Sequence, residues 1–328
     1  MRTKIQGVKQ PIRPWIVSGL KVLVSGFLLL FVLSKINIHG ATERISHAKF
    51  AYLGLALVLA LILPWILAIR WWILARKAVS WSDALAYTWI GLFFGLILPG
   101  SISGDVAKGG LLAWAKSSSR RAILPASIFA DRLVGLAVML VFFIIGSFVV
   151  ADTTQDKELA RFSSIAWRFG SIALAVLFSA LIPFVQRMAI SFFEILPQRI
   201  ASSSLKDFIE ATFAYSEKPS LLLSAGLLSA ISQSLGIAMY SVLMRALSVE
   251  LDTTPTIALY SIFAVLGMLP ISFAGVGVRD WFAVLFLAAY RLPPEIAVAF
   301  TWLCLSMNVC QAVVGGIWQF CIIEVGRT

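Results

Sequence analysis

Residues 98–108 read LPGSISGDVAK, and this stretch decides how the chain is interpreted. An apolar run ends there at a proline–glycine break, and Asp105 and Lys108 follow directly after it. Proline ends a helix because it removes a backbone donor and clashes with the preceding turn. At about 1.5 Å per residue, the apolar run 84–98 covers only about 22 Å of a hydrocarbon core of about 30 Å. The run therefore predicts a half-helix rather than a full membrane span.

A second break of the same kind occurs in the C-terminal half of the chain. Residues 269–275 read LPISFAG and align with residues 98–104 at an offset of 171, with four of seven positions identical. Paired broken segments in two halves are typical of transporters built from inverted repeats. The residues that form the two breaks are Pro99, Gly100, Gly104, Pro270, Gly275 and Gly277.

The composition places the whole chain in a membrane. Of the 328 residues, 60% are hydrophobic and 13% are charged, and the mean hydropathy is +0.92. A soluble protein carries about 25% charged residues. We therefore expect an all-α polytopic membrane protein with about six full transmembrane helices and two re-entrant helical hairpins in an inverted-topology repeat.

The apolar runs divide into two halves of similar order. The first half, residues 1–150, contains helices 15–34, 51–75 and 122–150 and the hairpin 84–115. The second half, residues 151–328, contains helix 166–186, an amphipathic linker 187–219, helix 220–244, the hairpin 256–290 and helix 296–323.

The basic residues give the expected orientation. With both termini in the cytoplasm, 15 Lys and Arg residues lie inside and 8 outside, in agreement with the positive-inside rule. This count places Arg70 with the cytoplasmic charges. The net charge of +11 then reflects cytoplasmic loops and lipid headgroups rather than nucleic acid. We expect a multi-pass protein of the bacterial inner membrane.

Six ionisable residues beside the breaks form the predicted site. They are Asp105, Lys108, Asp131, Arg132, Arg279 and Asp280, and their charges sum to zero. Each costs about 2.5–3.5 kcal/mol at the centre of a membrane helix on insertion scales. They either neutralise one another as structural ion pairs or bind a substrate. Helices that restart at mid-depth would add unpaired N–H groups that favour a phosphate, and Ser101 and Ser272 complete the predicted substrate-binding set.

These motifs resemble the signatures of the flippase-like family, also called the lysylphosphatidylglycerol synthase transmembrane region family. Residues 98–108 resemble the first signature, Asp131 and Arg132 resemble the acidic–arginine pair of the next helix, and residues 269–280 resemble the second signature. The resemblance implies an inner-membrane protein that moves a polar-headed lipid between leaflets. The chain stops at Thr328, without room for the soluble aminoacyltransferase domain of some relatives, so we expect no lysylphosphatidylglycerol synthesis.

The expected function is therefore a lipid flippase or scramblase. Its partner would be a phospholipid, such as aminoacylated phosphatidylglycerol, or another lipid-linked substrate that enters a midplane cavity. The mixed charges of the site favour a zwitterionic or cationic headgroup. The sequence contains no ATP-binding loop, and its three cysteines show no metal-ligand spacing, so we expect neither cofactor nor metal. Two alternatives stay open: a membrane-embedded transferase acting on a polyprenyl-linked substrate, and a non-catalytic subunit of a lipid or polysaccharide assembly complex.

Overall fold

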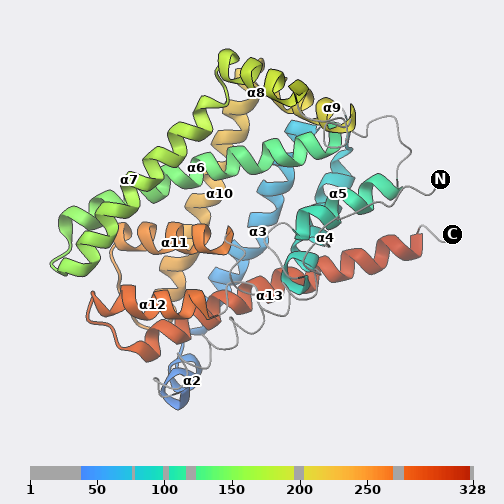
Figure 1. Cartoon of the computed structure of the whole chain (residues 1–328). Helices are drawn as coiled ribbons and strands as arrows, with labels where there is room; N and C mark the ends of the chain where they lie inside the picture. The colour runs from blue at the N-terminus through green and yellow to red at the C-terminus, as the bar shows by residue number, and fades with distance from the viewer. Residues whose placement is uncertain are drawn as a thin grey trace, which may run out of the picture.

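The computed structural model describes residues 38–75, 78–98, 103–115, 123–195, 203–268 and 277–325. These parts of the chain form helices joined by short connections (Figure 1). The predicted helix 15–34 lies outside the described residues. So do the predicted site or break residues Pro99, Gly100, Ser101, Pro270, Ser272 and Gly275.

The helices follow one another along the chain with few long connections. Their bounds are α2 Ile38–Ser46, α3 Phe50–Ala75, α4 Trp81–Ile97, α5 Ser103–Ala115, α6 Ile123–Thr153, α7 Lys157–Ser179, α8 Pro183–Ile195, α9 Ser203–Phe213, α10 Pro219–Ala246, α11 Thr253–Met268, α12 Val278–Ala288 and α13 Pro294–Val325. Within the described ranges, α3, α6, α7, α10 and α13 are long and apolar enough to cross a membrane. The predicted all-helical, multi-pass class is confirmed.

One predicted span is shifted along the chain. The sequence predicts a helix at 166–186, but α7 begins at Lys157 and ends at Ser179. Asp156 caps the helix, because its side chain accepts a hydrogen bond from the backbone N–H of Leu159 at 2.8 Å. The charged first turn of α7 is thus helical, and the connection to α6 is only three residues long.

The predicted amphipathic linker 187–219 contains two helices. α8 and α9 lie together at one end of the molecule in Figure 1, and α9 packs on α6. The rings of Phe129 and Phe208 make this contact, with centroids 5.6 Å apart.

Helices α3 and α10 run antiparallel through the centre of the bundle. The backbone N–H of Lys49, just before α3, donates to the carbonyl of Ala246 at the end of α10 at 3.0 Å. At the opposite end, Tyr215 precedes α10, and its hydroxyl donates to the carbonyl of Leu74 at the same distance. The two central helices therefore have opposite directions.

Two short helix pairs flank this central pair. In the first, the hydroxyl of Ser103 at the start of α5 donates to the carbonyl of Leu98, just after α4, at 3.1 Å. Gly91 and Gly104 let the two backbones approach, because a Cβ at Gly104 would lie 2.3 Å from the carbonyl oxygen of Gly91. In the second pair, α11 contacts α12 through Phe263 and Phe282.

Packing contacts in the first set of helices recur in the second set. α3–α4, α3–α6, α4–α5 and α5–α6 contacts correspond to α10–α11, α10–α13, α11–α12 and α12–α13 contacts. The contacts between the sets correspond too. A Cβ at Gly146 of α6 would lie 2.8 Å from the backbone of Ala258, and one at Gly315 of α13 would lie 2.1 Å from that of Trp89. Gly315 and Ala258 each follow their counterparts, Gly146 and Trp89, by 169 residues.

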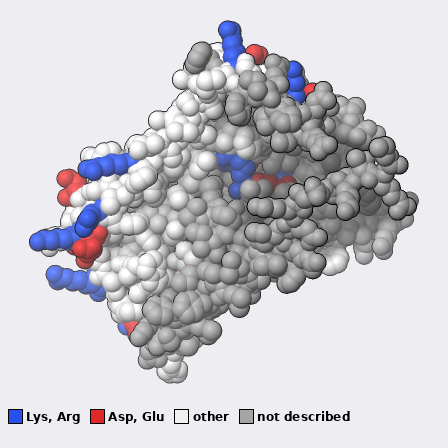
Figure 2. Space-filling view, in the orientation of Figure 1, with Lys and Arg blue, Asp and Glu red and all other residues white. Residues whose placement is uncertain are grey.

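The outer surface separates into charged ends and an apolar middle. Figure 2 shows basic and acidic side chains gathered near the α6–α7 turn and near α8, with a largely uncharged surface between them. Large apolar side chains are exposed on α6 and α7, among them Phe148, Phe169 and Ile172. An apolar exterior is what a lipid environment requires of a helical bundle.

Candidate functional site: a charged cavity between the two sets of helices

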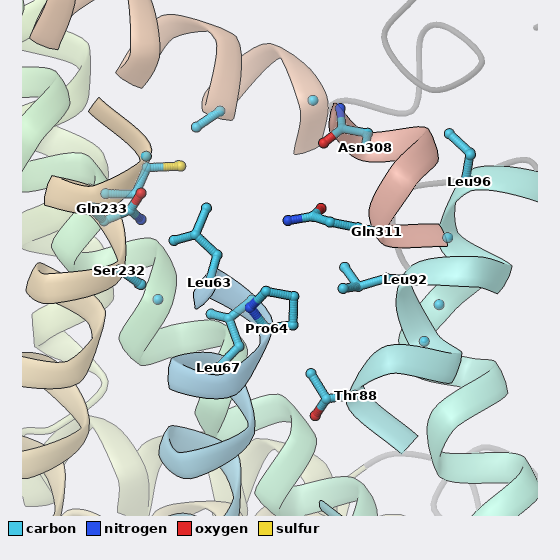
Figure 3. A pocket seen from close by; sticks show the side chains of 18 of the residues that line it. Leu63, Pro64, Leu67, Thr88, Leu92, Leu96, Ser232, Gln233, Asn308 and Gln311 are labelled. Carbon is cyan, nitrogen blue, oxygen red and sulfur yellow. The ribbon is translucent and has the colours of Figure 1, made fainter. Parts of the chain in front are cut away.

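A cavity of about 530 Å³ lies inside the bundle. Its lining comes from α3, α4, α5 and α6 and from α10, α11, α12 and α13, so both sets of helices contribute. Figure 3 shows Gln233 and Gln311 directed into this space from different walls, with Leu63, Pro64 and Leu67 of α3 beside them. The charged residues that line it are Arg70, Asp105, Lys108, Asp131, Arg132 and Arg279.

Arg70 and Asp131 form a buried ion pair that connects three helices. Nε and Nη2 of Arg70 donate to the two carboxylate oxygens of Asp131 at 2.7 and 2.9 Å, and Nη1 donates to the hydroxyl of Ser229 on α10 at 2.9 Å. Gly135 makes room for the guanidinium, because a Cβ there would lie 3.1 Å from Nη1. Such a bidentate, fully hydrogen-bonded pair is what permits two charges to be buried together.

Arg132 and Asp105 form a second ion pair, from α6 to α5. Their side chains are 40% and 21% exposed, against 9% and 12% for Arg70 and Asp131. Figure 2 shows a hollow below α6 in which basic and acidic atoms are visible. The second pair is therefore the more accessible of the two.

Lys108 lies on α5 against an aromatic face. Its Nζ is 3.5 Å from the ring centroid of Trp71, and the residue is buried. The Trp71 indole donates to the hydroxyl of Ser127 at 3.2 Å, and that hydroxyl donates to the carbonyl of Leu124. The cation–π contact holds the ammonium group against a tryptophan whose own donor is satisfied.

Arg279 is the charged group that α12 contributes to the cavity. A Cβ at Gly267 of α11 would lie 2.5 Å from its Nη2, so the absence of a side chain there lets the guanidinium lie against α11. Its Nε is buried, and no hydrogen-bond partner for it is found within the described part of the chain. Tyr260 lies on α11 about two turns before Gly267. Its hydroxyl donates to the Oε1 of Gln233 at 2.7 Å.

The sequence predicts that Asp280 contacts the substrate, but the structure places it outside the cavity lining. It is buried, is not among the lining residues, and accepts a hydrogen bond from the backbone N–H of Gly277 at 2.8 Å. The hydroxyl of Thr301 on α13 also donates to it. Asp280 therefore caps the first turn of α12 and ties that turn to α13. Gly277 has φ of 83°, a conformation that favours glycine.

Gln311 compensates for a proline in α3. Pro64 has no N–H, so the carbonyl of Ala60, four residues earlier, has no donor from its own helix. The Nε2 of Gln311 on α13 donates to this carbonyl at 2.6 Å. The carbonyl that lacks a donor in α3 is thus hydrogen-bonded by a side chain of α13 at the wall of the cavity.

The structure brings together five of the predicted charged residues: Asp105, Lys108, Asp131, Arg132 and Arg279. Gly104 also lines the cavity. Arg70 was the residue that sequence reasoning missed, because the topology count assigned it to the cytoplasmic side. Its position inside the apolar run 51–75, five residues before the helix ends, was the available signal. The structure buries it instead.

A family comparison identifies the class of membrane domain to which the chain belongs. The family model described as the lysylphosphatidylglycerol synthase TM region matches residues 19–308. The chain belongs to this family. The match covers seven of the eight cavity-lining helices in full and the first half of α13. Searches of curated proteins and of solved structures gave no significant match.

Proposed function

We propose that this family member moves a phosphate-containing lipid between the two leaflets of its membrane, as a flippase or scramblase. The observation that supports this is the charged cavity inside a bundle with an apolar exterior. Charges inside a membrane protein are expensive, and they usually mark the path of a polar substrate. A headgroup could enter the cavity while its acyl chains stay in the bilayer.

The arrangement of helices supports an alternating mechanism. We infer an inverted-topology repeat from the antiparallel α3 and α10 and from the contacts that recur after 169 residues. In this interpretation α4–α5 and α11–α12 are re-entrant hairpins that enter from opposite sides and meet at the cavity. Movement of each hairpin would open the cavity to one leaflet, as in transporters with inverted repeats.

The proposal includes an orientation and a role. We place the protein in the bacterial inner membrane with both termini in the cytoplasm, because the basic residues then follow the positive-inside rule. The role is transport rather than synthesis. The Arg70–Asp131 pair favours a structural role for part of the charge, as in the alternative of a non-catalytic assembly subunit, because all its polar contacts are already made within the bundle.

A liposome assay tests the function. The purified protein is reconstituted with a fluorescent phospholipid, and the fraction quenched by external dithionite is followed over time. We expect Arg279→Ala and Arg132→Ala to abolish the protein-dependent movement while the thermal unfolding midpoint stays close to wild type. Arg245→Gln, an exposed cation at the end of α10, is the matched control and should keep the wild-type rate.

Two results would contradict the proposal. Unchanged rates in both cavity variants would exclude the site, and no movement with the wild-type protein would favour the assembly-subunit alternative.

A further inference from the structure

The charge of the cavity differs from the sum that the sequence predicted. Within the described ranges, four cations and two carboxylates line it, because Arg70 belongs to the lining and Asp280 does not. The segments 99–102 and 269–276, which follow α4 and α11 in the sequence, contain no acidic residue. The described part of the lining therefore has an excess of two positive charges.

Both carboxylates of the lining are already engaged. Asp131 is held by two donors of Arg70, and Asp105 is held by Arg132. An ammonium group would compete with Arg132 for Asp105. It could reach Asp131 only by displacing Arg70, which would leave a buried charge without its partner. That exchange is unfavourable because an uncompensated charge in a low-dielectric interior is strongly destabilising.

The donors around Arg279 are, by contrast, available for an anion. Its guanidinium has no carboxylate contact among the described residues, and its Nε has no hydrogen-bond partner among them. The Gln233 oxygen is occupied by Tyr260, so the amide nitrogen is the end of Gln233 that can serve a ligand in the cavity. Guanidinium and amide donors together suit phosphate oxygens.

We propose that the cavity selects a lipid whose headgroup is a phosphate without an attached amine, and that Arg279 binds this phosphate. This inference rests on the proposed function and makes its substrate class more specific. It also reverses the expectation from the sequence that a zwitterionic or cationic headgroup is favoured. An anionic phosphate compensates the excess positive charge, whereas the cationic headgroup of an aminoacylated lipid increases it.

Native mass spectrometry in nanodiscs tests the selectivity. The discs contain equal amounts of dioleoyl phosphatidylglycerol, its lysyl ester and dioleoyl phosphatidylethanolamine, and the lipids retained by the released protein are counted. We expect phosphatidylglycerol to be retained about tenfold over the lysyl ester, the ratio that one charge-assisted contact supplies. Arg279→Gln should remove the preference, Arg279→Lys should keep part of it, and Arg245→Gln should leave it unchanged.

A charge-reversal variant and a soluble anion sharpen the test. Gln233→Glu adds a carboxylate to the lining and should shift retention toward the lysyl ester. In delipidated protein, inorganic phosphate that raises the unfolding midpoint in wild type but not in Arg279→Gln would assign recognition to the phosphate group itself. Stabilisation by phosphatidylglycerol alone would assign it to the complete headgroup.

The proposal and the function fail in different ways. Equal retention of the three lipids, or a preference that survives in Arg279→Gln, would overturn the anion selectivity even if lipid still moves in liposomes. Selective retention with no lipid movement would instead refute the flippase function and leave the anion site in place.

Discussion

Replacing Gln311 with leucine should destabilise the bundle only while residue 64 is proline. The amide of Gln311 donates at 2.6 Å to the carbonyl of Ala60, which Pro64 deprives of its helical donor. Ala60 is fully buried in the apolar core, so the carbonyl of this residue has no ready substitute when the amide is removed. The Gln311→Leu variant therefore leaves one buried acceptor unsatisfied.

The magnitude follows from two estimates. An unsatisfied buried polar group costs about 1–3 kcal/mol in proteins generally. Side-chain hydrogen bonds between membrane helices average only about 0.6 kcal/mol and reach about 1.7 kcal/mol. We expect about 1–2 kcal/mol for Gln311→Leu, near the upper membrane value, because Pro64 removes the local alternative. In a Pro64→Ala background the restored N–H should bond to Ala60, and the same substitution should cost less than about 0.5 kcal/mol.

Reversible unfolding in mixed micelles, followed by tryptophan fluorescence, measures this double-mutant cycle. The cycle removes the separate effect of Pro64→Ala on packing, because that effect is common to both members of each comparison. An equal cost of Gln311→Leu in both backgrounds would refute the assignment of the amide to the proline-freed carbonyl.

Two further predictions concern the charged groups. Gly267→Ala should weaken anionic-lipid retention and lipid movement, because its Cβ would lie 2.5 Å from the Nη2 of Arg279. Gly226→Ala, where nothing lies within 4 Å, is its control, and equal loss in the two variants would argue against a local effect. Asp131→Asn should cost about 3–5 kcal/mol of unfolding free energy because it leaves Arg70 buried without a carboxylate. Changing both residues to leucine should cost less, which the same micelle assay measures; an additive double variant would show that the pair is not coupled.

Much of the fold was predictable because it depends on local patterns. Long apolar runs give membrane helices wherever the backbone must satisfy its own hydrogen bonds, and α3, α6, α10 and α13 lie close to the predicted ranges. The predicted start of α7 was wrong because the charged first turn of this helix resembles a loop in a hydropathy pattern. The cap by Asp156 stabilises that turn, and a hydropathy pattern does not detect caps.

The candidate site was predictable in its members but not in its pairings. The cost of a charge in a membrane is a local property, so Asp105, Lys108, Asp131, Arg132 and Arg279 could be selected from the sequence. Asp280 satisfied the same criterion, yet the structure uses it to cap α12. Sequence reasoning had no means to separate the capping carboxylate of Asp280 from the lining carboxylate of Asp105, because each closely follows one of the two breaks.

The sequence alone determined the class of protein, most of the long apolar helices and the type of residue at the candidate site, since each follows from a short window of the chain. Only the tertiary structure decided that Arg70 lies beside Asp131, 61 residues away. It also decided that Gln311 donates a hydrogen bond to the carbonyl of Ala60, 251 residues away. These contacts depend on how whole helices are rotated and placed against one another. The excess positive charge of the described lining arises from that placement, because packing brings Arg70 into the lining and keeps Asp280 out of it.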